Sequence, residues 1–352
     1  MTTSGTLGVT VFDNDTIQKH AMLLAGVPAS RLTPENVLTI KESLYLLMLE
    51  LTAMGTNLWS IKQGLFGVYP GRIRVPLPLG TTDVLNYSYR ITQRTVPPSI
   101  TSSAGGVVAY LSDSNVNTVF TQGGANGTVT CDNNAGPPIN TVGLLPGAGG
   151  TWSFVLEQSL DNITYTEVLT VTDQVVINGS WLWYQLEPSG TQRYFRLRAT
   201  DGTVLSLREF YLSSTYYDIP MNRLNRDDYS SLPFKQFPSQ QTLQFWVDRK
   251  FDGVDLVLWP SPSTTFACIW LMMYQETQDP GSLTDTLAVP PRAFPGIVKK
   301  LAKDILLKVP GADLARMPLI EKMADAAVFI GRADERDNSP VFLAPDISPY
   351  TK

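Results

Sequence analysis

The sequence predicts an α+β fold: a helical domain with short strands, interrupted by an inserted all-β sandwich. The first observation behind this prediction is a sharp change in composition. Residues 91–214 contain no lysine and no methionine, although the chain has 11 and 9 of them, and they hold 13 of its 26 glycines. The second observation is that helical periodicity is confined to the flanks. Segments that differ so much in residue usage are expected to form separate cores.

Four parts are therefore expected in the 352 residues. The first part of the host domain covers 1–90, the insert 91–214, the second part of the host domain 215–336, and a C-terminal arm 337–352. The arm is expected to be extended, because each proline in it lacks an amide hydrogen and restricts the residue before it. These prolines are Pro340, Pro345 and Pro349.

The first flank is predicted to begin with two helices. Asp15 is expected to cap a helix that ends near Gly26. Thr33-Pro34-Glu35 predicts a second helix, since a hydroxyl cap, a proline in the first turn and an acid near the positive end of the helix dipole all favour a start. Apolar residues at helical spacing continue to Met54. Val84–Arg90 then alternates like a strand.

The second flank is predicted to form strands and then two helices. Thr242–Asp248 and Val254–Trp259 are strand candidates around a tight turn at Asp252-Gly253, and Cys268–Gln275 is a third. The two helices are expected from Pro291 to about 309 and from about Pro318 to Gly331.

The middle segment is predicted to be β throughout. Seven short apolar stretches, separated by turn residues, have the count and spacing of a sandwich. They are Val107–Leu111, Gly127–Cys131, Trp152–Gln158, Thr164–Val171, Trp181–Leu186, Arg193–Ala199 and Val204–Leu212.

Composition limits the chemistry. Lys+Arg 27 against Asp+Glu 32 gives a net charge of −5, so bulk charge does not favour nucleic-acid binding. A single histidine, His20, excludes multi-histidine metal sites, and Gly-x-Ser-x-Gly does not occur. The two cysteines are far apart in the sequence and favour neither a disulfide framework nor a thiolate metal site. No secretory signal is expected, and no apolar run reaches the ~18 residues that span a bilayer. We therefore expect no enzymatic activity and no membrane contact.

One loop of the insert is a candidate calcium site. Asp113, Asn115 and Thr118 place several oxygen ligands in one short segment, as hard cations prefer. The same residues are also typical of ordinary turns, which is the alternative. No other cofactor is expected.

Two further sets of residues are candidates for binding. Alternation along predicted strands gives Trp181 and Trp183 a common face, and likewise Arg196 and Arg198. Together they are a candidate sugar- or protein-binding face, with an ordinary half-buried sandwich surface as the alternative. Lys299, Lys300 and Lys303 give the predicted helix after Pro291 a basic side, which is either a solvated face or a wall beside DNA or an acidic partner.

The host domain resembles a known family. The two N-terminal helices, the strands up to Tyr89-Arg90, the Tyr217–Pro233 segment, the phrase Leu258-Trp259-Pro260 and the two closing helices occur in the order found in the head-to-tail adaptor of short-tailed bacteriophages. That family is also called the packaged-DNA stabilisation or tail tubular A-type protein. The resemblance covers about 220 residues, all but the insert.

The resemblance implies a structural virion protein, made in the host cytoplasm and placed at the head–tail junction. About twelve copies would form a ring below the portal protein, with the tail nozzle or fibres attached to it and double-stranded DNA passing through without specific contacts. It would close the head after packaging and give a channel for ejection. Portal docking would fall to the arm, through Pro340, Val341, Phe342, Leu343, Ile347 and Tyr350, and Lys299, Lys300 and Lys303 are candidates to face the channel.

The insert resembles a discoidin, or galactose-binding-like, sandwich. The matching phrases are Ser102-Ser103-Ala104-Gly105, Asp113–Thr118, Trp152–Thr166 and Arg193–Leu197. The resemblance implies a surface that binds fibres or host glycans through its loops. Two other functions remain open: a carbohydrate-binding or glycan-degrading virion protein, and an adhesion module.

Overall fold

The computed structural model describes residues 12–28, 33–53, 60–134, 136, 138–187, 192–276, 281–287 and 289–334. The chain divides into two compact units. The helical unit is built from both ends of the chain, residues 1–61 and 275–352, and the β unit comprises residues 62–274. Among the described residues, the protein is mostly β, with a few helices confined largely to the helical unit.

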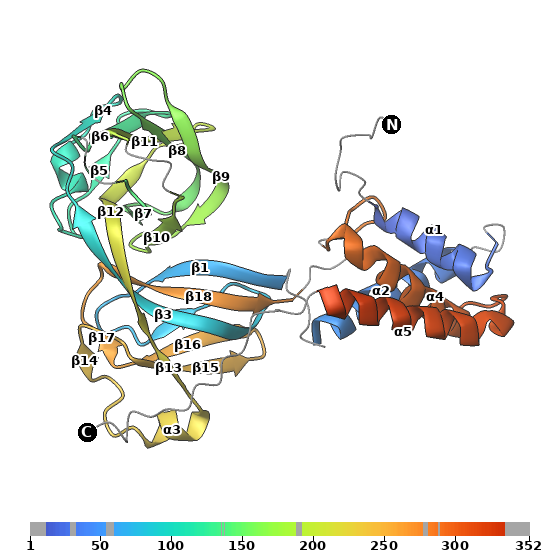
Figure 1. Ribbon diagram of the computed structural model, residues 1–352. Coiled ribbons are helices and arrows are strands. Elements are labelled where there is room, and N and C mark those ends of the chain that lie inside the picture. The colour runs from blue at the N-terminus through green and yellow to red at the C-terminus, as the bar shows by residue number, and fades with distance from the viewer. Residues whose placement is uncertain are drawn as a thin grey trace, which may run out of the picture. The chain divides into compact units, whose positions relative to one another are not determined.

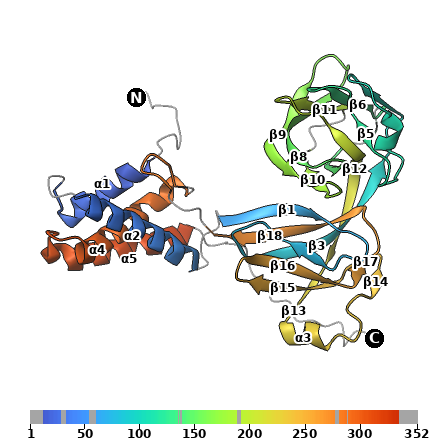
Figure 2. The same ribbon diagram turned by 180° about the vertical axis from the view of Figure 1, so that it is seen from behind.

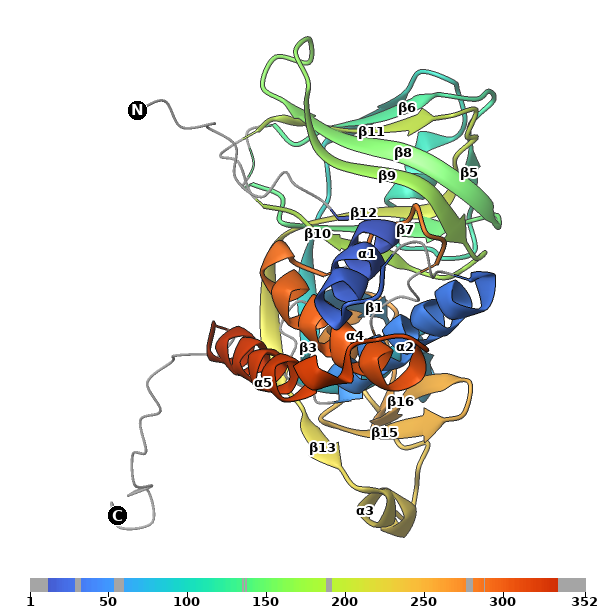
Figure 3. The ribbon, with the colours of Figure 1, turned by 90° about the vertical axis from the view of Figure 1, so that its right-hand side faces the viewer.

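The helical unit contains α1 (Asn14–Ala25), α2 (Pro34–Ala53), α4 (Phe294–Lys308) and α5 (Met317–Asp334). The helix α4 packs against each of the other three, which are grouped around it in Figure 3. Its buried side chains Ile297, Leu301 and Ile305 recur at helical spacing and lie in a core with residues of α1 and α2. No helix among the described residues is long and apolar enough to cross a membrane.

Capping residues explain where the first helices begin. Asp13, not Asp15, is the N-cap of α1, because its Oδ1 accepts from the amide of Thr16 at 2.8 Å. Asp15 instead lies in the first turn and pairs with Lys19. Gly26 ends α1 with a left-handed backbone (φ 74°), as predicted. The predicted start at Thr33 is confirmed, since its Oγ1 accepts from the amide of Asn36 at 3.3 Å.

One part of the β unit contains two sheets around one core, and we call this part the base. One sheet has the order β13 (Asn222–Leu224), β15 (Gln244–Lys250), β16 (Gly253–Trp259) and β2 (Arg74–Pro76). The other includes β1 (Ile61–Gly67), β18 (Ala267–Gln275) and β3 (Thr81–Thr95). The predicted hairpin is confirmed, because β15 and β16 pair antiparallel from Lys250↔Gly253 to Gln244↔Trp259. The short α3 (Arg226–Ser231) and the two-residue strands β14 (Pro238–Ser239) and β17 (Ser261–Pro262) complete the base.

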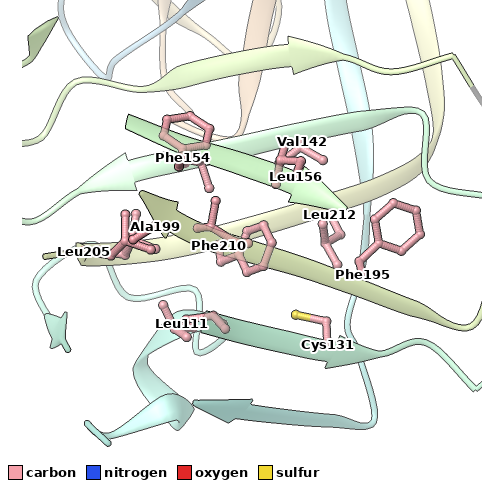
Figure 4. Packing of buried hydrophobic residues seen from close by; sticks show 14 of the residues in the cluster. Leu111, Cys131, Val142, Phe154, Leu156, Phe195, Ala199, Leu205, Phe210 and Leu212 are labelled. Carbon is pink, nitrogen blue, oxygen red and sulfur yellow. The ribbon is translucent and has the colours of Figure 1, made fainter. Parts of the chain in front are cut away.

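The upper part of the β unit is a β-sandwich. One sheet has the order β4 (Ser99–Ser102), β6 (Thr128–Asp132), β11 (Tyr194–Thr200), β8 (Gly150–Ser159) and β9 (Thr166–Val176). Facing it are β10 (Leu182–Gln185), β7 (Thr141–Pro146), β12 (Ser206–Pro220) and β5 (Phe120–Thr121). Side chains from both sheets, including Phe154, Leu156, Phe195, Phe210 and Leu212, fill the core between them (Figure 4).

Three strands of the sandwich are absent from the prediction and one predicted strand is wrong. Val108–Leu111 forms a 3-10 helix instead of a strand. The missed strands are β4, β5 and β7. All six residues of β7 are buried, so it lacks the alternation by which a half-exposed strand is recognised.

Two long strands join the sandwich to the base. β3 and β12 pair antiparallel from Ser88↔Pro220 to Thr95↔Leu212, and both run from the base into the sandwich (Figures 1 and 2). The predicted limits of the insert at 91 and 214 therefore fall inside continuous strands. Because β3 also neighbours β18 and β12 also neighbours β7, the strands β3, β18, β1, β10, β7 and β12 form a closed circuit shared by base and sandwich.

The fold makes a first prediction in the sandwich core. Phe210 is fully buried, so Phe210→Ala should lower the free energy of unfolding by about 3–5 kcal/mol, the usual loss for removing a buried aromatic ring. Leu160 is exposed, and Leu160→Ala should change it by less than about 0.5 kcal/mol. Urea titrations measure both; equal losses would contradict the assigned core.

Candidate functional site

A cluster of aromatic side chains lies where the sandwich meets the base, and we call this region the junction. Trp181 and Trp183 stack with ring centroids 4.8 Å apart and contact Tyr211 edge-on, and Phe266 completes the cluster. Residue 143 on the neighbouring strand β7 must be glycine, since a Cβ there would come within 2.8 Å of the Trp183 ring. Both tryptophans are only 6% exposed. Their predicted place on an exposed binding face is therefore wrong: they are core residues of the junction.

Arg196 and Arg198 lie on a different sheet from these tryptophans. They do share a face of β11, as predicted, but both pair with the buried carboxylate of Glu157, at 2.6 and 2.8 Å. The Arg196 guanidinium also lies 3.5 Å from the centroid of the Tyr165 ring. The four residues predicted to form one face are thus divided between two sites.

A buried ion pair lies beside the junction. Arg94, near the end of β3, donates to Oε2 of Glu209 on β12, to the Leu111 carbonyl at 3.2 Å and to Ser114 Oγ at 2.8 Å. The Glu209 side chain is fully buried. Burial raises the pKa of Glu209, against the opposing effect of Arg94.

The same contacts bear on the predicted calcium site. Arg94 contacts this loop through Ser114 Oγ. Within the loop, Asp113 accepts from the Asn115 amide at 2.9 Å and from Thr118 Oγ1 at 2.9 Å, which is the pattern of an ordinary turn. These bonds agree with the alternative that the sequence left open, an ordinary turn, and the calcium site stays a prediction. Among the described residues, His, Cys, Asp and Glu side chains form no group of three that could hold a metal.

A second arginine on the same face of β3 also joins the two strands. Arg90 forms a two-pronged pair with Asp218 of β12, both bonds 2.7 Å long, and donates to Gln185 at 2.9 Å. Between the two arginines, Thr92 Oγ1 donates to the hydroxyl of Tyr211 at 3.1 Å. Nearby, burial raises the pKa of the Cys268 thiol to about 12, which disfavours the reactive thiolate form.

The predicted basic side of α4 is largely neutralised within the helical unit. Lys300 pairs with Glu50 of α2 at 3.1 Å, and Lys303 with Glu321 of α5 at 2.6 Å. Lys299 lies at the edge of an apolar groove lined by Phe12, Phe294 and other side chains, and the exposed His20 lines the same groove. Two of the three lysines are therefore paired with acids of the helical unit. The predicted docking residues Pro340, Val341, Phe342, Leu343, Ile347 and Tyr350 lie outside the described residues.

A cavity opens at the edge of the junction, with a volume of about 360 Å³. Tyr69, Pro70 and Thr265 line it from the base, and the sandwich contributes Val116, Asn117, Leu145, Asn178, Gly179 and Arg208. Its walls therefore combine an aromatic ring, apolar side chains, two amides and one guanidinium. No pattern in the sequence indicates this set, because its members lie up to 196 positions apart and share no motif. One signal was available: Arg208 and Glu209 interrupt an apolar predicted strand, Val204–Leu212.

Comparison with known proteins finds likeness in part of the chain. No protein-family model matches it, and no curated protein matches it. Among solved structures, it is similar to the CBM32 module of AlyQ in complex with 4,5-unsaturated mannuronic acid, with 21% identity and a TM-score of 0.31 over 35% of this chain and 99% of the other. The CBM32-5 module of a Clostridium perfringens protein, in complex with GalNAc-β-1,3-galactose, matches at 16% identity and a TM-score of 0.29, over 33% of this chain and 94% of the other. The family 32 module of C. perfringens NanJ, in complex with galactose, matches at 11% identity and a TM-score of 0.31, over 36% and 99%.

The buried pair makes a second prediction. Arg94→Ala should lower the free energy of unfolding at pH 7 by about 3–5 kcal/mol, because it leaves the Glu209 carboxylate buried without its partner. Without Arg94 the pKa of Glu209 in the folded variant should rise further. At pH values above the usual pKa of glutamate, Glu209 is then still protonated in the folded variant but ionised in the unfolded chain. The stability of the variant therefore falls as pH rises through that window, and the loss should shrink toward about pH 4.

Urea titrations at both pH values measure this effect. Arg198→Ala is the matched control, since Glu157 keeps Arg196 when Arg198 is removed. A loss for Arg94→Ala that is no larger than the control, or one that is independent of pH, would contradict the assigned role.

Proposed function

We propose that this chain is a non-enzymatic assembly protein in which a self-associating scaffold holds a carbohydrate-binding sandwich. The observation that carries the proposal is the attachment of the sandwich. Two strands run into it without interruption, and the junction has an aromatic cluster and two buried or half-buried arginine pairs. Such an attachment fixes the direction of the sandwich, whereas a flexible linker would leave it free to rotate.

Two features support a carbohydrate as the ligand. The phrases of the insert resemble galactose-binding-like sandwiches, and the junction cavity combines a tyrosine ring, apolar walls and side-chain amides. Small-molecule sites of this size are mostly apolar with a few polar groups that orient the ligand. A protein that binds glycans without cleaving them needs no further catalytic group.

This gives a third prediction. The full chain, labelled and applied to an array of bacterial and host glycans, should bind a restricted set with micromolar to millimolar affinity, to be confirmed by calorimetry. The same glycans should remain uncleaved after prolonged incubation. Absence of binding would contradict the ligand class, and the release of shorter products would contradict the non-enzymatic assignment.

The scaffold has a more specific candidate role, that of a head-to-tail adaptor. This role rests on the resemblance of the host domain's sequence to that family. Several large apolar side chains of the helical unit are exposed, including Leu38 (61%), Leu46 (56%) and Leu319 (62%). Contact with further copies of the chain would bury them, as in a ring between portal and tail.

The fourth prediction follows from these side chains. The purified chain should form oligomers, alone or with its portal, with rings visible by negative-stain imaging and a mass of several chains by light scattering. Leu38→Lys with Leu46→Lys should shift the protein to monomer and leave its melting temperature nearly unchanged, because both side chains are already exposed. Leu79→Lys, at an exposed position in the base, is the control. A chain that stays monomeric with and without the portal would contradict this role.

A further inference from the structure

The junction cavity contains a guanidinium whose charge is not compensated. Arg208 donates from Nη1 to the Val116 carbonyl at 2.7 Å and from Nη2 to Oδ1 of Asn178 at 3.2 Å, and both acceptors are neutral. Its Nε is buried and has no hydrogen-bond partner. Among the residues that the structure describes, no carboxylate lies within ion-pair distance of Arg208, and none lines the cavity.

Two hydrogen bonds hold the Arg208 side chain in place. Its two bonds hold the guanidinium plane between the 113–118 loop and the 177–180 loop, and they use two of its five N–H donors. A planar guanidinium with free donors is well matched to a carboxylate, which can accept two parallel hydrogen bonds. The neighbouring Glu209 does not neutralise it, because that carboxylate is buried against Arg94.

The opposite wall of the cavity comes from the base. The Tyr69 hydroxyl accepts from the Trp181 amide at 2.6 Å, so the ring is fixed in orientation. The guanidinium of Arg72 lies 5.2 Å from the centroid of this ring and adds a second positive charge nearby. The amides of Asn117 and Asn178 are exposed at the cavity and offer donors and acceptors for hydroxyl groups.

We propose that this cavity binds a hexuronate residue of an acidic glycan. Its carboxylate would pair with Arg208, its hydroxyls with Asn117 and Asn178, and its ring would lie against Tyr69 and Val116. The inference rests on the proposed carbohydrate binding and goes beyond it by naming the acidic class and the place. It also makes the site composite, because Tyr69, Pro70 and Thr265 belong to the base and not to the sandwich.

The test compares two ligands that differ only in the acid. Calorimetry on the full chain should give at least about tenfold tighter binding of a glucuronate-terminated disaccharide than of its glucose-terminated counterpart, and added salt should weaken only the binding of the acidic disaccharide.

Two variants test the role of the cavity. Arg208→Gln should remove the preference for the acidic disaccharide. Since Arg208 also holds a loop, Asn117→Asp is the second variant: it places a negative charge at an exposed position and should weaken the acidic ligand at least about tenfold at an unchanged melting temperature.

Matched controls and outcomes distinguish this inference from the proposed function. Arg249→Gln and Asn86→Asp change exposed residues of the base away from the cavity and should alter neither affinity. Glycan binding that neither cavity variant weakens, or that ignores the acid, would overturn the inference and leave the proposed function intact. N-acetylglutamate amide bound as tightly as the glucuronate would assign the cavity to an acidic peptide and overturn it. If no saccharide binds at any concentration, both fall.

Discussion

The pairing of β3 with β12 is the contact on which the rest of the β unit depends. One face of β3 carries Arg90, Thr92 and Arg94, and each meets a specific partner. Because Arg90 and Glu209 are almost fully buried, a one-residue slip between the strands would leave charges without partners inside the protein. The polar groups therefore set the register, and the register sets where the sandwich begins.

The aromatic cluster also depends on strand pairing between the sandwich and the base. Trp181 directly precedes β10 and Trp183 lies on it, and β10 pairs with β1 of the base through Leu182↔Phe66. Trp181 also contacts the base through two hydrogen bonds, from its amide to Tyr69 and from Nε1 to Thr265 at 2.9 Å. The junction thus joins strands that are far apart in the sequence, and its cavity has walls from both parts. A surface formed in this way exists only when both parts are folded and correctly joined.

The sequence was informative where local chemistry decides the structure. Caps, proline positions and alternation predicted α2, the β15–β16 hairpin, β18 and the closing helices, whereas the limits that composition gave for the insert fall inside β3 and β12. It failed where the deciding contact is distant. Alternation assigned Trp181 and Trp183 to one face but could not say that base strands cover that face. Arg94 and Glu209 are 115 positions apart, so nothing local indicates that they pair. Likewise, nothing local indicates that the oxygen-rich Asp113–Thr118 loop contacts Arg94, which lies on β3, 20 positions before Ser114.

The buried pair of Arg94 and Glu209 makes the sandwich depend on the base. Arg94 lies on β3, a strand that begins in the base, and its loss leaves Glu209 buried without a partner. The folding of the loop is therefore coupled to the docking of β3, and a sandwich separated from the base would lose part of its own interior. This coupling would suit the proposed display of the sandwich in one fixed direction, because any loosening of the attachment would also destabilise the sandwich.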